Sequence, residues 1–130
     1  MRSIATITSI ACSALLILSG PVFADAATVR TLAGISMHLQ HFPGEADKQK
    51  LAAITAADDS SAAEKAVASA LARFEHHVTP ADKEKLEAVA ADESVPADLR
   101  TVAGILVTVN HTPSAADAET LDKIVSGAGS

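Results

Sequence analysis

The stretch Arg30-Thr31-Leu32-Ala33-Gly34-Ile35 decides the fold, because residues 100–105 repeat it as RTVAGI. A second stretch, ADKQKL at residues 46–51, returns as ADKEKL at residues 81–86. Both matches fit one gap-free period of 35 residues, with three copies at about residues 28–62, 63–97 and 98–130. A fixed period of this length is typical of helical repeats, in which each copy is one supersecondary unit.

Five positions of the repeat carry the same residue in all three copies. They are two alanine columns, one histidine, one aspartate and one leucine column: Ala33/Ala68/Ala103, Ala46/Ala81/Ala116, His41/His76/His111, Asp47/Asp82/Asp117 and Leu51/Leu86/Leu121. Alanine-rich sequence imitates repetition easily, but it does not place a histidine six residues before an aspartate three times. The columns therefore mark positions that the folded unit requires.

Each copy predicts two helices. The first, from about Val29 to His41 and its equivalents, has apolar residues at helical spacing on one face. The second begins after an N-cap at Gly44, Thr79 or Ser114, each next to a turn-forming proline at residue 43, 80 or 113. Residues 105–109 (ILVTV) read alone as a strand, but the same columns in the other copies favour a helix.

The expected fold is all-α, with three tandem helical hairpins and six helices. Hairpins in series form either a short α-solenoid or a compact six-helix globule, and the sequence leaves both open. Residues 99–109 are apolar on most of the helix circumference, with Val107 at the centre of the outer face. Such a helix is buried inside a globule or covered by another subunit, so the chain is expected to be a monomer or a homodimer.

Residues 1–24 predict a cleavable signal peptide. Arg2 supplies a positive start, Ile4 to Leu18 form an apolar stretch of about 15 residues, and Val22-Phe23-Ala24 matches a signal-peptidase site. An apolar stretch of this length is shorter than the roughly 20 residues that span a bilayer. We expect cleavage after Ala24, with Ala26 as the weaker alternative, and export to a bacterial periplasm or the medium as one domain over residues 25–130.

Composition narrows the partners of the mature chain. Cys12 is the only cysteine and lies inside the predicted signal, so the exported domain folds on core burial without disulfides. Removing Arg2 leaves nine basic residues against 16 acidic ones, a formal charge of −7, and the chain has no Trp or Tyr. A nucleic-acid surface needs clustered cations with stacking aromatics, so we expect no nucleic-acid partner and no membrane span after cleavage.

The repeated His-x5-Asp pairs are the candidate site residues: His41/Asp47, His76/Asp82 and His111/Asp117. The favoured interpretation is a structural latch, with each histidine at the end of one helix paired to the aspartate at the start of the next. The alternative is weak metal contact, since histidine is the commonest transition-metal ligand. Equivalent positions in stacked hairpins lie about 9–10 Å apart, so three histidines are not expected to share one ion.

The sequence contains no nucleophile elbow, no Gly-rich phosphate loop and no paired catalytic carboxylates. We therefore expect no enzymatic activity and no cofactor. The favoured function is an exported interaction module that presents its helices to an unknown protein or peptide partner. The alternative function is a small periplasmic metal or ligand binder that uses the histidine-lined turn edge.

Overall fold

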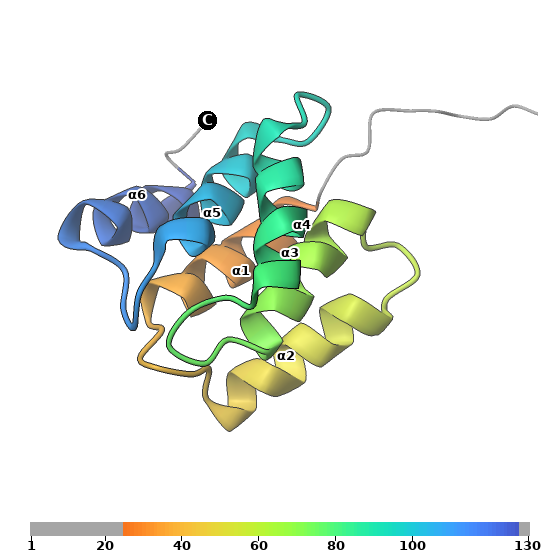
Figure 1. Ribbon diagram of the computed structural model, residues 1–130. Helices are drawn as coiled ribbons and strands as arrows, with labels where there is room; N and C mark the ends of the chain where they lie inside the picture. Colours follow the sequence, from red (N-terminus) through yellow and green to blue (C-terminus); the bar gives the residue numbers. More distant parts are fainter. Residues whose placement is uncertain (1–24, 128–130) are drawn as a thin grey trace, which may run out of the picture.

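A computed structural model of the chain describes residues 25–127, and the predicted signal segment lies outside this range. Within it the chain forms six helices and no strand, which confirms the all-α prediction with two helices in each copy. The helices are α1 (Ala26–Met37), α2 (Glu45–Ala56), α3 (Ala62–Ala72), α4 (Pro80–Ala91), α5 (Ala97–Thr108) and α6 (Ala115–Ser126) (Figure 1).

Local capping chemistry explains where several of these helices begin. Ser61 and Ser114 accept from the backbone of the third helical residue, and the acidic side chain there returns a bond to the cap, which completes a capping box. Thr79 caps α4, where Pro80 takes the first helical position that tolerates proline. The predicted starts after Gly44, Thr79 and Ser114 are confirmed.

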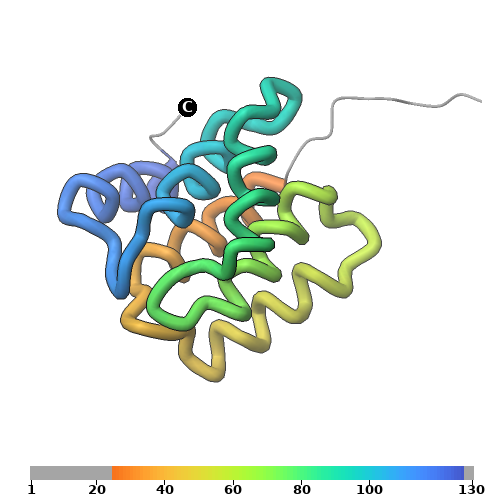
Figure 2. Tube along the Cα trace, viewed as in Figure 1, coloured from red at the N-terminus to blue at the C-terminus, as the bar shows by residue number. Residues whose placement is uncertain are grey.

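The most extensive helix packing joins neighbouring copies instead of the two helices of one copy. α2 packs on α3, α4 packs on α5, and α6 returns to pack on α1, so the third copy meets the first. The trace in Figure 2 shows this return of the last helix to the orange first helix. The array therefore closes into a globule, and the open solenoid alternative is wrong.

The first helices of the three copies, α1, α3 and α5, contact one another at the centre of this closed arrangement. Their shared alanines, Ala33, Ala68 and Ala103, are completely buried. A small side chain at this column lets three helices approach one approximate threefold axis. The shared leucines Leu51, Leu86 and Leu121 are also fully buried, and they anchor α2, α4 and α6 to the core.

The strand-like stretch at residues 105–109 is helical through Thr108, as the repeat predicts. α5 contacts α1, α3, α4 and α6, which accounts for its apolar circumference. Val107 is half-buried and packs against the core cluster. Burial within the globule thus accounts for the helix, while the state of association stays a prediction. Among the described residues, no helix has the length and apolar character to cross a membrane.

Candidate functional site

The three histidines of the repeat share an unusual backbone conformation. His41, His76 and His111 have φ angles of 65°, 68° and 71°, the left-handed region that few residues other than glycine adopt. Each follows the end of a first helix, at Met37, Ala72 or Thr108, so the predicted extension of those helices to the histidines is wrong. The left-handed residue turns the chain out of the helix direction and toward the second helix.

In two copies a hydrogen bond closes a three-residue turn around the histidine. The Phe42 N–H donates to the Gln40 carbonyl at 2.6 Å, and the Thr112 N–H donates to the Asn110 carbonyl at 2.9 Å. A turn of this kind with positive φ at its centre is the rare, strained form of the γ-turn. Strained backbone persists only where the surrounding structure stabilises it, so further contacts must stabilise these turns.

A cyclic set of backbone hydrogen bonds holds the three turns together. The His76 N–H donates to the His41 carbonyl at 2.7 Å, the His111 N–H to the His76 carbonyl at 2.6 Å, and the His41 N–H to the His111 carbonyl at 3.1 Å. Each copy donates to one neighbour and accepts from the other. The cycle closes only because the third copy returns to the first, so it is the polar counterpart of the α6–α1 packing.

The same closure brings the three imidazole rings together at one exposed surface. Their centroids are 5.1 Å apart for His41 and His76, 5.4 Å for His41 and His111, and 4.9 Å for His76 and His111. We call this cluster the histidine triad. The expected separation of 9–10 Å is wrong, because that distance applies to hairpins stacked in a line and these hairpins surround an axis.

The rings pack edge to face in two pairs and tilted in the third. As the side chains lie, no set of three or more His, Cys, Asp or Glu side chains in residues 25–127 is arranged to hold a metal ion. The triad thus places the centroids of three imidazole rings 4.9–5.4 Å apart, but the ring nitrogens do not converge on a common point in this conformation.

A cavity of about 220 Å³ adjoins the triad. Its polar lining includes Lys48 and Glu75, and its apolar lining includes Phe42, the large hydrophobic side chain that is 63% exposed. The full lining is His41, Phe42, Lys48, Ala72, Phe74, Glu75 and His76. Two triad members therefore form a wall of a recess where a small molecule has room beside the imidazoles.

The aspartates of the repeat do not pair with the histidines. Asp82 accepts from the Arg73 Nε at 3.1 Å and also from the Arg73 Nη2, and the Thr79 hydroxyl donates to it at 2.9 Å. Asp47 pairs with Lys50 at 3.4 Å, and Asp117 accepts from the Ser114 hydroxyl at 2.7 Å. The latch is wrong in its choice of partner: Asp47 and Asp117 bond to residues of their own helix or its N-cap, and Asp82 bonds to Arg73 at the end of the first helix of its copy.

We call the connection between the two helices of one copy its elbow. Among the ion pairs in residues 25–127, the Arg73–Asp82 pair at the elbow of the second copy has the most buried carboxylate. The Asp82 side chain is 2% exposed, whereas that of Arg73 is 54% exposed. Hydrogen bonding from Arg73 lowers the pKa of Asp82 below its ordinary value, against the opposing effect of burial, and the Thr79 hydroxyl adds to the lowering. The same carboxylate raises the pKa of Arg73. Sequence reasoning missed Arg73, because only the first-helix-to-second-helix geometry reveals its partner.

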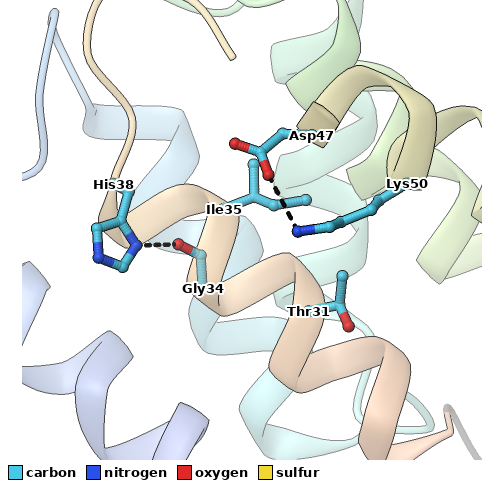
Figure 3. Close-up of a pocket in the computed structure, with 6 residues that line it drawn as sticks. All are labelled: Thr31, Gly34, Ile35, His38, Asp47 and Lys50. Atoms are coloured by element: carbon cyan, nitrogen blue, oxygen red, sulfur yellow. Dashed lines mark hydrogen bonds and ion pairs between the residues drawn. The ribbon is translucent and has the colours of Figure 1, made fainter. Parts of the chain in front are cut away.

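The corresponding elbow of the first copy is open. His38 occupies the Arg73 position, and its Nδ1–H donates to the Gly34 carbonyl at 2.9 Å, away from Asp47. A cavity of about 450 Å³ lies here, lined by Thr31, Gly34, Ile35, His38, Asp47 and Lys50. Figure 3 shows His38 on one side of this cavity and the Asp47–Lys50 pair on the other.

Comparison of the chain with known protein families, curated proteins and solved structures finds no significant match.

Proposed function

We propose that the chain is an exported, non-enzymatic binding protein that holds one transition-metal ion on the histidine triad. The observation that carries the proposal is the convergence of three imidazoles, one from each copy, within 4.9–5.4 Å of each other at exposed positions. The function expected as the alternative from the sequence, a metal or ligand binder, is thereby favoured over a partner-binding module.

The backbone alone does not account for histidine at this column. The cyclic hydrogen bonds use only main-chain N–H and carbonyl groups, and the left-handed conformation is easier for glycine or asparagine. Histidine nevertheless stands at all three positions. The side chains therefore contribute something that the turn does not require, and metal ligation is the chemistry for which three imidazoles are suited.

The ring spacing fits one shared ion. Three imidazoles that bind Zn²⁺ at about 2.0–2.1 Å in tetrahedral geometry place their ring centres about 5 Å apart. The nitrogens of the triad do not yet converge, but exposed side chains rotate about their χ angles without repacking a core. Binding thus requires reorientation of three rings on a fixed backbone. Zn²⁺ and Cu²⁺ are the ions that imidazole ligands favour.

Three protein ligands leave one coordination position for water or a small ligand. The cavity that includes Phe42, Lys48 and Glu75 adjoins two of the three ligands. A small anion bound to the ion has a cationic neighbour there in Lys48. The proposed site therefore resembles a carrier site more than a closed structural site.

Isothermal titration calorimetry of the purified protein with ZnCl2 and CuCl2 tests the proposal. We expect one ion per chain, with at least a tenfold loss of affinity in each of His41→Asn, His76→Asn and His111→Asn. Asparagine tolerates positive φ, so these variants keep the turn and remove only the imidazole. His77→Thr is the matched control, because the third copy has Thr112 at that column. Unchanged affinity in the Asn variants contradicts the proposal.

A second candidate function, the interaction module for a protein or peptide, is supported by the exposed Phe42. A single exposed aromatic ring with polar neighbours is the kind of residue that anchors protein interfaces. Photo-crosslinking in the native compartment from a photoreactive residue at exposed position 75, which lines the same cavity as Phe42, tests it, once with Phe42 kept and once with Phe42→Ser. A partner captured by the wild-type chain and lost with Phe42→Ser supports this function, and equal capture by both contradicts it.

A further inference from the structure

Glu64 is a carboxylic acid in a position that the repeat otherwise fills with apolar side chains. It is 1% exposed, and its equivalents Val29 and Leu99 are 4% and 0% exposed. Burying a carboxylate is costly unless hydrogen bonds and a cation compensate for the lost hydration. The other two copies show that the fold does not need an acid there, so Glu64 has a purpose of its own.

One of the two carboxylate oxygens of Glu64 has a local role at the start of α3. The Glu64 Oε2 accepts from the Ser61 N–H at 2.6 Å, which is its share of the capping box at the start of α3. The other oxygen, Oε1, accepts at 2.8 Å from the backbone nitrogen of Asp25, which lies 39 residues away. Capping explains the first bond and not the second.

Among residues 25–127, no lysine, arginine or histidine forms an ion pair with Glu64. The buried acid thus has two backbone donors and no cationic side chain. Its long-range donor is the first residue of the described fold, and Asp25 also caps α1 by accepting from the Ala27 N–H at 3.2 Å.

The sequence places the favoured signal-peptidase cut immediately before this residue, after Ala24. Cleavage there converts the Asp25 amide into an α-ammonium group with a full positive charge. We propose that Glu64 binds this newly formed N-terminus, so that removal of the leader completes a partly buried ion pair that joins the start of α1 to the start of α3.

The ion pair has two consequences. It replaces a neutral N–H donor by a charged one, and charge-assisted hydrogen bonds are roughly twice as strong as neutral ones. It also distinguishes the products of the two possible cuts, because a cut after Ala26 removes Asp25 together with its cap and its bond to Glu64. The inference is independent of the histidine triad and uses none of its residues.

The first test is the intact mass of the exported, purified protein, expressed with its own leader. We expect the mature chain to begin at Asp25. A chain that begins at Ala27, or one that retains the leader, overturns the proposal.

The second test measures how fast an acylating reagent modifies the α-amine of the folded mature protein. An ammonium held on a buried carboxylate is protected, so we expect acylation about tenfold slower in the wild type than in Glu64→Gln, the change that a one-unit shift in amine pKa produces. Glu64→Leu places the residue of the third copy at this column and provides a folded variant if Glu64→Gln is too unstable. Glu93→Gln, an exposed acid, is the control. Equal acylation rates in the wild type and the Glu64 variants overturn the proposal.

Discussion

The elbows of the first and second copies differ in how the residue at the end of the first helix is bonded. Both have an aspartate at the third position of their second helix, but Arg73 reaches across to Asp82 whereas His38 bonds back to its own helix at Gly34. The second elbow is therefore closed by an ion pair, and the first contains a cavity of about 450 Å³. Shared columns define the fold of the copies, while the columns that differ determine which elbow is open.

The histidine column shows the opposite relation. His41 and His76 differ from the elbow residues in that both copies use them identically, with the same left-handed backbone and the same place in the hydrogen-bonded cycle. The shared histidines lie where the three copies contact one another. Chemistry that depends on three copies together is expected at the shared columns, and chemistry of one copy alone at the variable ones.

The largest expected effect on the free energy of unfolding comes from the leucine column, which the two copies share. Leu51→Ala and Leu86→Ala each remove a completely buried side chain and are expected to lower the free energy of unfolding by about 2–5 kcal/mol. Urea unfolding measures both, with the exposed Lys83→Ala as control. Losses no greater than that of the control contradict a shared core column, and a large difference between the leucines contradicts the equivalence of the copies.

The next largest effect on stability is expected when Arg73 in the second elbow is replaced by histidine, the residue at the equivalent position 38 of the first copy. Arg73→His leaves the Asp82 carboxylate, whose side chain is 2% exposed, without its cation. We expect a loss of roughly 1–3 kcal/mol in the free energy of unfolding, the cost of an unsatisfied buried acceptor. Thermal unfolding measures it, with Arg30→His as the exposed arginine control. A loss equal to that of the control shows that the pair does not stabilise the elbow.

The acid stability of the second elbow gives a smaller effect with a defined sign. The folded-state pKa of Asp82 is lowered by Arg73, so its contribution is present above the unfolded pKa of about 3.9 and is lost as pH falls through the folded value. We expect Asp82→Asn to flatten the stability profile below that pH. The effect is smaller than that of Arg73→His, because asparagine is neutral and leaves no buried charge without a cation. An unchanged acid profile contradicts the assignment.

The smallest expected effect is the reverse exchange. His38→Arg places a guanidinium opposite Asp47, as in the second copy, and a partly exposed ion pair is worth about 0.2–1 kcal/mol. We expect a gain within that range, reduced by added salt, and a smaller elbow cavity in a crystal structure of the variant. Destabilisation shows that the first elbow is not built to accept the residue of the second.

Much of the fold follows from the sequence because it depends on local patterns. The 35-residue register, the caps at Thr79 and Ser114 and the buried column of Leu86 are all visible as residue types at fixed spacing. Closure of the array does not follow, because apolar periodicity shows which faces are buried and not which helix covers them. The contact between α6 and α1 depends on how successive copies are oriented, which residue types at fixed spacing do not show.

The candidate site depends on that closure and was therefore only half predictable. The sequence singled out His41, His76 and His111 but placed them far apart and paired them with aspartates. A signal was present in their position between a helix end and a proline-containing turn, since a left-handed residue often ends a helix. Their convergence on one axis required knowledge of the tertiary fold. The contact of Glu64 with Asp25 could not be predicted either, because the two residues are 39 positions apart and no local pattern links them.

The central claim is that three copies close on one axis and offer three imidazoles to one ion. X-ray absorption spectroscopy at the zinc edge, on protein loaded with one equivalent of Zn²⁺, tests it most directly because it counts imidazole ligands. We expect three imidazole nitrogens at about 2.0–2.1 Å in the wild type and two in His111→Asn. A first shell with no more than one imidazole in the wild type, or the same imidazole count in the variant, contradicts the account.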